Sequence, residues 1–264
     1  MQVVNRTSAE KREARREALR AQRKAEVTRQ RRVRSAVISA AVIMALVLAG
    51  GVGYLIFTAT RANSLVTAPG DVPADRAYYS LGAPDGSGQP VLELHIDFMC
   101  PFCGDFEQLH GQDLAEIVAN EEATVHLYTR RFLDPKSTTG DYSSRAANAL
   151  ACVYDDDPDN LVVYQNLLFA NQPSELSAGL DSAELFELSQ QAGASAAVEE
   201  CINGKTHQSW VRTVAEPGAA GRASTTPYVS INGAEFSEWG EAGSLREAVL
   251  GASTGETGAS DDGK

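Results

Sequence analysis

The feature that most constrains the fold is the Cys-Pro-Phe-Cys motif, Cys100 to Cys103, which lies between two different hydrophobic patterns. Before it, Val91 to Met99 (VLELHIDFM) is a mostly apolar run with the length of a buried strand. After it, Pro101 suits the first turn of a helix, and apolar residues then recur at helical spacing. The sequence therefore predicts a strand that leads directly into a helix, with both cysteines at the helix N-terminus.

Beyond the motif, strand and helix patterns alternate, which predicts an α/β domain with a helical insert. The other expected elements are a strand at Thr124 to Phe132, mostly helical pattern from Pro135 to Glu216, a strand at Tyr228 to Ile231, a two-residue hairpin turn at Asn232-Gly233, a returning strand at Ala234 to Phe236 and a short helix at Ser244 to Leu250.

A long apolar segment near the N-terminus predicts a membrane anchor. No formally charged residue lies between Arg34 and Arg61, and Ala36 to Phe57 is almost entirely apolar. About 20 such residues cross a hydrocarbon core of roughly 30 Å. A cleaved signal peptide would have a shorter basic start and a shorter apolar stretch. We therefore expect one transmembrane helix over residues 36–59.

The charge distribution sets the expected topology and excludes one class of function. Residues 1–35 carry 12 basic and 4 acidic side chains, so the remaining residues account for 11 basic and 31 acidic ones, a net charge of −20. The positive-inside rule keeps the basic segment cytoplasmic and exports the residues C-terminal to the span. An acidic exported domain repels phosphate, which argues against nucleic-acid binding.

The sequence thus divides into five parts. We expect a basic cytoplasmic segment at 1–35, a transmembrane helix at 36–59, a linker at 60–76, the folded domain at 77–250 with its helical insert at about 135–216, and a disordered tail at 251–264. The linker contains two prolines and no helical period, and the tail is polar and rich in glycine.

The four cysteines all lie in the part expected to be exported, where an even number indicates disulfides. Three pairings are possible. Cys100 and Cys103 are one helical turn apart, and the backbone N–H groups and dipole of a helix N-terminus favour a thiolate on the first sulfur. Two other interpretations remain open: a zinc site, for which His95 and His110 show no supporting ligand spacing, and a permanently closed structural disulfide.

The order of three features resembles the DsbA family: Phe98 to Cys103 follows a strand, a long helical insert comes next, and Thr226-Pro227-Tyr228-Val229 begins a later strand. More narrowly, they are similar to the membrane-anchored DsbA-like thiol:disulfide oxidoreductases of actinobacteria, over roughly Ala77 to Leu250. The resemblance implies a thioredoxin fold, Pro101 and Phe102 in the active-site turn, and Cys100 and Cys103 as catalytic cysteines. It also implies a cis Pro227 next to the sulfurs, with Thr226 and Pro227 holding substrate backbone.

The same resemblance implies a second, structural disulfide between Cys152 and Cys201 in the insert. One position departs from the family: members commonly place a buried acid six residues before the first cysteine, and this chain has Leu94. Asp97 is the nearby acid. We expect it to accept hydrogen bonds from backbone donors near the turn, and proton removal from Cys103 would use water, Asp97 or no dedicated group.

The sequence therefore predicts an extracytoplasmic enzyme that introduces disulfides into exported cysteine-containing proteins. No metal or organic cofactor is implied, and the resemblance suggests reoxidation by a membrane oxidase of the VKOR type. A reductase or isomerase, and a non-catalytic thioredoxin-fold binding module with a closed CxxC disulfide, remain alternatives.

Overall fold

The computed structural model describes residues 66–253 continuously and eight single positions before them, residues 34, 37, 38, 44, 47, 48, 50 and 51. The chain divides into two compact units, residues 1–62 and 63–264, and the second contains the folded domain. None of the helices among the described residues has the length and apolar character that a membrane span requires. The predicted span at 36–59, apart from those single positions, and the predicted tail beyond residue 253 lie outside the described residues.

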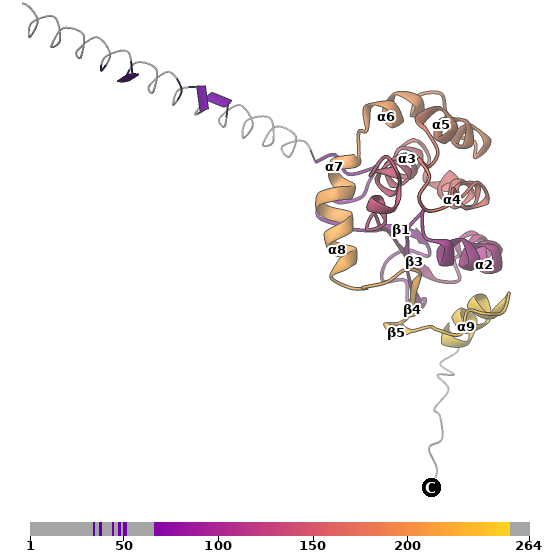
Figure 1. Ribbon diagram of the computed structural model, residues 1–264. Coiled ribbons are helices and arrows are strands. Elements are labelled where there is room, and N and C mark those ends of the chain that lie inside the picture. Colours follow the sequence, from indigo (N-terminus) through magenta and orange to yellow (C-terminus); the bar gives the residue numbers. More distant parts are fainter. Residues whose placement is uncertain are drawn as a thin grey trace, which may run out of the picture. The chain divides into compact units, whose positions relative to one another are not determined.

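A five-stranded sheet forms the centre of the domain, in the order β1-β3-β2-β4-β5 (Figure 1). The strands are β1 (Tyr79–Gly82), β2 (Val91–Ile96), β3 (Thr124–Thr129), β4 (Tyr228–Ile231) and β5 (Ala234–Glu235). The central strand β2 pairs in parallel with β3 and antiparallel with β4. This mixed sheet with helices confirms the predicted α/β class.

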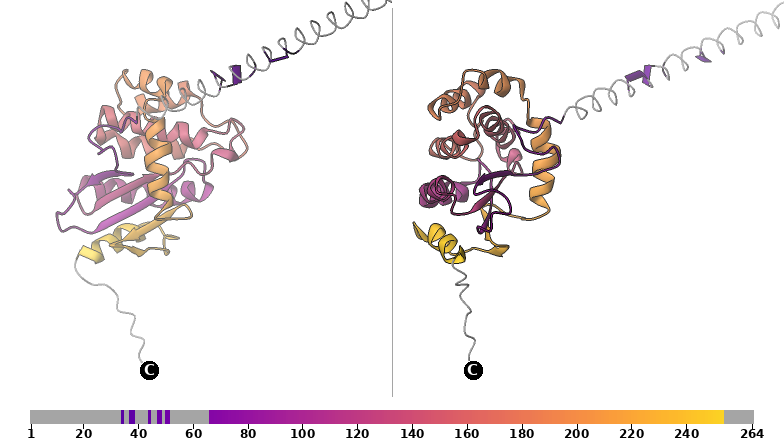
Figure 2. Two further views of the ribbon diagram at one scale, coloured as in Figure 1. Left: turned by 90° about the vertical axis from the view of Figure 1, so that its left-hand side faces the viewer. Right: turned by 180° about the vertical axis from the view of Figure 1, so that it is seen from behind.

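Helices lie on both sides of the sheet (Figure 2). Their bounds are α2 (Pro101–Ala119), α3 (Tyr142–Asp156), α4 (Leu161–Ala170), α5 (Ser182–Gln191), α6 (Val198–Gly204), α7 (Gln208–Trp210), α8 (Glu216–Ala220) and α9 (Ser244–Ser253). Short 3-10 turns at Asp134–Lys136 and Pro158–Asn160 and a π-helical segment at Val211–Ala215 complete the insert. Helices α2 and α9 pack together on one side of the sheet, and the α7–α8 column lies on the other.

The strand before the cysteines is shorter than the apolar run predicts. β2 ends at Ile96 rather than Met99, because the Asp97 carboxylate accepts a hydrogen bond from the Met99 N–H at 3.0 Å and the Asp97 carbonyl accepts one from the Cys100 N–H at 2.9 Å. These bonds turn the chain away from the sheet. Phe98 and Met99 are fully buried although they lie in this turn. Their apolar side chains therefore extend the hydrophobic pattern of the strand beyond its actual end.

The segment from Val66 to Arg76, expected to be part of a linker, has no helix or strand but packs on the insert. The Gly70 N–H donates to Asp155 at 2.7 Å, and the Tyr154 hydroxyl donates to Asp71 at 2.9 Å. Val72 is buried in the core. This part of the predicted linker therefore belongs to the folded domain.

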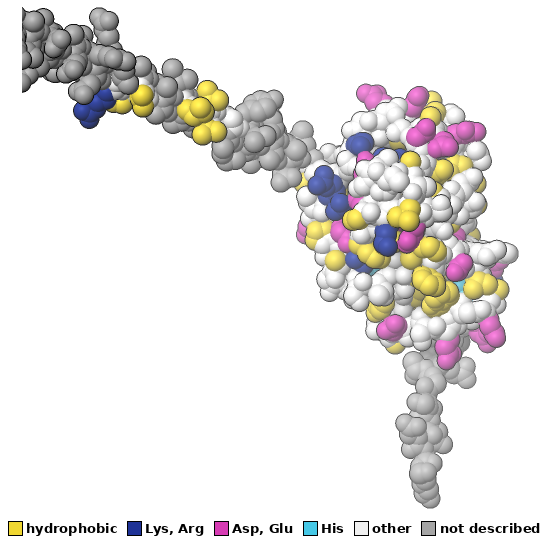
Figure 3. All heavy atoms as spheres, in the orientation of Figure 1, with side chains coloured by type: hydrophobic (Ala, Val, Ile, Leu, Met, Phe, Trp, Pro, Cys, Tyr) yellow, Lys and Arg dark blue, Asp and Glu magenta, His cyan; other side chains and the backbone are white. Residues whose placement is uncertain are grey.

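Acidic residues outnumber basic ones by 31 to 11 in the sequence after residue 35. On the face shown in Figure 3, acidic side chains are spread over the end formed by the insert helices and around the opposite end near α9, while basic side chains gather in a smaller area.

Candidate active site

Cys100 and Cys103 are free thiols at the start of α2. Cys100 occupies the N-cap position, where its side chain makes no capping hydrogen bond, and Pro101 follows in the first turn. The Cys100 residue is 5% exposed and Cys103 is fully buried, whereas the Phe102 side chain between them is 64% exposed. Of the two thiols, the first is therefore the one within reach of a substrate.

The surroundings of Cys100 stabilise its thiolate and lower its pKa from 9.0 to about 6. The largest contribution is the hydrogen bond from the Cys103 thiol, and the Thr226 side chain and the backbone N–H groups of Cys103 and Phe102 add to it. Burial acts in the opposite direction but is outweighed. A thiolate near neutral pH is both the better nucleophile and the better leaving group.

The pKa of Cys103 shifts in the opposite direction, upwards. Its burial raises the pKa of its thiol well above the usual value, and the neighbouring Cys100 adds to the effect because two adjacent thiolates repel. At neutral pH, Cys103 therefore keeps its proton and uses it to stabilise the Cys100 thiolate.

The Thr226–Pro227 peptide bond is cis and lies directly beside Cys100. In the protonated form, the Cys100 thiol donates to the Thr226 carbonyl oxygen at 3.4 Å. The buried Thr226 hydroxyl has no hydrogen-bond partner among the residues from 66 to 253, so it is available to donate to the thiolate. The structure thus brings together the four sequence-predicted residues Cys100, Cys103, Thr226 and Pro227.

Two arginines hold the segment that carries this peptide bond. Arg130 donates to the Ala223 carbonyl at 2.8 Å and forms an ion pair with Glu216 at 3.0 Å. Arg222 forms two hydrogen bonds to the buried Glu93 on β2, at 2.6 and 2.7 Å. Each arginine lies far from its acid in the sequence, so local sequence patterns contain no signal for these pairs.

Asp97 connects the active-site turn to the helical insert. It is fully buried, and its carboxylate accepts hydrogen bonds from the Met99 N–H, the Leu133 N–H at 3.1 Å and the Ser143 hydroxyl at 2.6 Å. Burial nevertheless raises its pKa from 3.8 to about 7, and the charge of the nearby Cys100 adds to this. Asp97 therefore satisfies backbone donors at the turn, as expected.

Leu94 is fully buried on β2, and its position provides an apolar wall rather than a proton acceptor. A second residue, not foreseen from the sequence, closes the turn from the other side: the Gln172 amide donates to the carbonyls of Phe98 at 3.2 Å and Cys100 at 2.9 Å. Gln172 comes just after α4. Nothing in its local sequence pattern distinguishes it from a surface glutamine.

A groove of about 860 Å³ begins at this turn and runs along α2. Pro101, Gly104 and Gln108 lie on its α2 side, and Asn166, Phe169 and Gln172 on the side of α4.

Cys152 on α3 and Cys201 on α6 are joined by a disulfide, with their Cα atoms 5.8 Å apart. This bond ties two helices of the insert together. Among the described residues, this cysteine pair and His207 form a group of side chains that could hold a metal ion. The two cysteines of the CxxC motif do not belong to such a group.

Comparison with known proteins places these features in a family. A family model described as Thioredoxin matches residues 79–249. The chain is 31% identical to the serine/threonine-protein kinase PknE of Mycobacterium tuberculosis over 147 residues, which cover 53% of this chain but only 26% of the kinase. The chain thus spans about a quarter of that relative's length.

Solved structures match a larger share of the domain. The reduced form of the disulfide bond oxidoreductase DsbG from M. tuberculosis is 31% identical, with a TM-score of 0.57 over 74% of this chain and 93% of that one. Oxidised DsbA from M. tuberculosis is 28% identical, with a TM-score of 0.52 over 66% and 95%. The thiol-disulfide oxidoreductase MdbA from Actinomyces oris, 19% identical with a TM-score of 0.56 over 72% and 98%, shares the fold. The chain therefore belongs to the thioredoxin family, and within it resembles the DsbA-like thiol:disulfide oxidoreductases of actinobacteria.

Proposed function

We propose that the protein is a thiol:disulfide oxidoreductase that uses Cys100 as its nucleophile. The observation that carries the proposal is the contact between the Cys100 sulfur and the carbonyl oxygen of Thr226, at 3.4 Å, with the buried Cys103 one helical turn behind. The similarity to DsbG and DsbA of M. tuberculosis supports the same activity.

The mechanism rests on the difference between the two thiols. With Cys100 and Cys103 joined in a disulfide, a substrate thiolate attacks the accessible Cys100 sulfur, the Cys100–Cys103 bond breaks, and Cys103 leaves and takes up a proton. A second substrate thiol loses its proton and attacks the substrate sulfur of the mixed disulfide. Cys100 then leaves as a thiolate, which the N-terminus of α2 stabilises. The substrate has lost two electrons and two protons; the CxxC pair has gained both electrons and, on Cys103, one proton, and the other proton goes to solvent.

Substrate backbone is expected to bind at Thr226 and Pro227. The Thr226 carbonyl faces Cys100, so an extended chain beside the cis peptide bond places its own cysteine next to the Cys100 sulfur. The exposed Phe102 offers an apolar contact at the same edge. We propose that the substrates are exported proteins with pairs of cysteines.

We also propose that the domain works outside the cytoplasmic membrane, anchored by residues 36–59 with the basic N-terminal segment inside. The proposal rests on the uncharged apolar stretch and on the excess of basic residues before it. A membrane oxidase linked to quinones, of the VKOR type, would restore the Cys100–Cys103 disulfide after each cycle. A reporter enzyme that works only after export, fused after Lys264, should be active. An inactive fusion would contradict this topology.

Transfer of a disulfide to a peptide tests the activity. The purified oxidised protein is mixed with a reduced peptide that contains two cysteines, and the reaction is followed by mass spectrometry. We expect one mole of peptide disulfide per mole of protein, and none from the Cys100→Ser/Cys103→Ser variant. A CxxC pair that stays closed with excess peptide and with dithiothreitol would instead identify a binding module.

The direction of the reaction is tested by equilibration with glutathione buffers. We expect a reduction potential more oxidising than that of glutathione, because the low pKa of Cys100 favours the reduced form of the pair. A potential close to that of thioredoxin would identify a reductase.

A further inference from the structure

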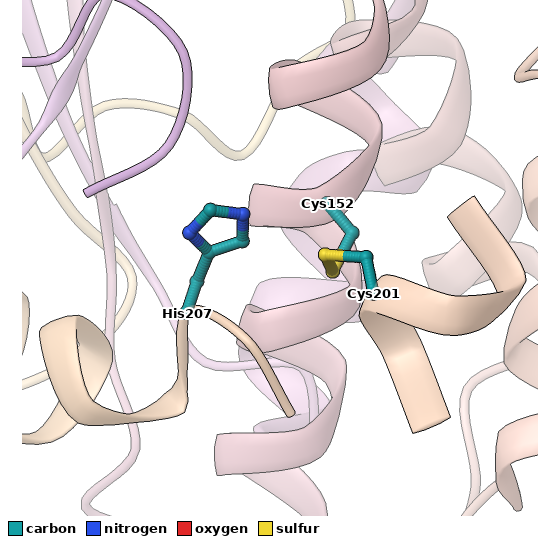
Figure 4. Close-up of side chains that lie close together, drawn as sticks. All are labelled: Cys152, Cys201 and His207. Carbon is teal, nitrogen blue, oxygen red and sulfur yellow. A yellow bond between two sulfur atoms is a disulfide. The ribbon is translucent and has the colours of Figure 1, made fainter. Parts of the chain in front are cut away.

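A buried histidine lies beside the second disulfide. Figure 4 shows the imidazole of His207 next to the Cys152 and Cys201 sulfurs. One ligand atom from each of the three residues lies within 4.8 Å of the others. Cys152 comes from α3, Cys201 from α6, and His207 directly precedes α7, so the three side chains join separate elements of the insert.

The hydrogen bonds of His207 leave one ring nitrogen with a free lone pair. Its Nδ1 lies 2.9 Å from the Thr67 carbonyl oxygen, and a carbonyl only accepts, so Nδ1 carries the proton in this contact. Nε2 is fully buried and has no hydrogen-bond partner among the described residues, and its distance to the Asp155 carboxylate is 3.6 Å. A histidine held in this way, by a backbone carbonyl on the other nitrogen, is typical of metal ligands.

Asn148 organises both sides of the cluster. Its amide nitrogen approaches the Cys152 sulfur at 3.8 Å, and its amide oxygen accepts from the His207 backbone N–H at 2.9 Å. The residue is almost completely buried. An N–H directed at a sulfur stabilises a thiolate more than a disulfide sulfur, because only the thiolate carries a full negative charge.

We propose that Cys152, Cys201 and His207 form a Zn²⁺ site when their disulfide is reduced. A dithiol breaks the S–S bond, gives two electrons and two protons to the two sulfurs, and itself becomes a cyclic disulfide. Zn²⁺ then binds the two thiolates and Nε2 and displaces the two thiol protons, with no change in its own charge. Two thiolates and an imidazole are ligands that Zn²⁺ prefers, at about 2.3 Å and 2.0–2.1 Å.

Asp155 can supply the fourth ligand. Its carboxylate lies 3.6 Å from Nε2, and its side chain is 47% exposed. Cys201 is partly exposed as well, which gives an ion a way in. Asp155 or a water molecule would complete a tetrahedral shell. The metal and the disulfide are then alternative crosslinks between α3 and α6, and a chain in which Cys152 and Cys201 have not yet been oxidised would use the metal.

The site is tested in the full-length Cys100→Ser/Cys103→Ser variant, which removes the other two thiols, so the result does not depend on the proposed oxidoreductase activity. The protein is reduced with dithiothreitol, desalted under nitrogen and titrated with Zn²⁺ by calorimetry. We expect one ion per reduced chain, no binding to the oxidised chain, and slower reoxidation of the thiols when zinc is bound. A reduced chain that binds no zinc overturns the proposal.

His207→Ala in the same background should weaken zinc binding at least tenfold, while His126→Ala should leave it unchanged, because His126 pairs with Asp85 elsewhere in the domain. Equal affinity in all three proteins would contradict the assignment of His207. X-ray absorption of the zinc-loaded parent decides the question even if His207→Ala does not fold. Two sulfur ligands with an imidazole support the site, and a shell without imidazole excludes it.

Discussion

The Cys100 sulfur and the Thr226 carbonyl oxygen are 3.4 Å apart, although 126 residues separate them in the sequence. The whole helical insert lies between these two positions and returns the chain to the start of α2. Because of this contact, the thiol that the helix N-terminus activates lies beside the backbone that is proposed to hold the substrate.

The thiolate of Cys100 should make the stability of the reduced protein depend on pH. Its folded pKa of about 6 lies below the unfolded value, so the stabilisation is fully present above the unfolded pKa and is lost as the pH falls towards 6. We expect the free energy of unfolding of the reduced protein, relative to that of Cys100→Ser, to fall between pH 9 and pH 6, as measured by urea denaturation. A difference between the two proteins that does not change with pH would contradict the low pKa.

Asp97→Asn should destabilise the domain by about 1–3 kcal/mol, because the amide replaces an oxygen that accepts from a buried donor. Ser143→Ala, which removes only the hydroxyl donor, should cost less. The Asp97→Asn substitution should leave the pKa of Cys100 near 6, because the Asp97 carboxyl, with a pKa of about 7, is mostly protonated and uncharged where Cys100 ionises. Absorbance of the thiolate measures this. A Cys100 pKa that shifts clearly in either direction in Asp97→Asn would show that the carboxyl is charged when Cys100 ionises.

Replacing either cysteine of the insert should reduce stability without affecting the active site. Closing a loop of 49 residues contributes about 4 kcal/mol in the chain-entropy model. Cys152→Ser and Cys201→Ser should therefore each lower the melting temperature by about 10 °C. Reaction of Cys100 with a thiol reagent should proceed at the parent rate. Unchanged melting of both variants would show that the bond contributes nothing.

Leu94→Glu tests whether the missing acid limits turnover. Leu94 is fully buried, so the new carboxyl costs stability but supplies a proton acceptor behind Cys103. The attack of Cys103 on the mixed disulfide, which is the reverse of the first step and re-forms the Cys100–Cys103 bond, should become faster, as measured by quenched-flow mass spectrometry. Leu94→Gln is the matched control, because it has a similar size and no titratable proton. Equal rates in both variants would show that proton removal does not limit resolution.

The elements with a strong local pattern could be predicted from the sequence. The strand and helix around Cys100 and the hairpin at Asn232-Gly233 are of the expected types, and β2 and α2 begin at the expected residues. β1, with only four residues, is too short to produce a periodic signal and was not predicted. The apolar pattern extends past the end of β2 because Phe98 and Met99 are buried in a turn, where the hydrogen bonds of Asp97 rather than hydrophobicity set the boundary.

The site was only partly visible in the sequence. The CxxC motif and the Thr226-Pro227 pair are local patterns, so they could be recognised. Gln172 and Arg130 act through long-range hydrogen bonds to backbone carbonyls, and such contacts leave no spacing or composition that a sequence reveals. The role of His207 depends on the Thr67 carbonyl, which lies in a segment expected to be a linker.

Trapping of mixed disulfides tests the division of labour between the two cysteines most directly. Cys103→Ala and Cys100→Ala are each expressed as full-length protein, and adducts are counted on non-reducing gels and identified by mass spectrometry. Cys103→Ala should accumulate adducts with cysteine-containing proteins, because no neighbouring thiol can attack Cys100 and release the bound protein. Cys100→Ala should accumulate almost none, because Cys103 is buried and keeps its proton. Equal trapping by the two variants would contradict the account.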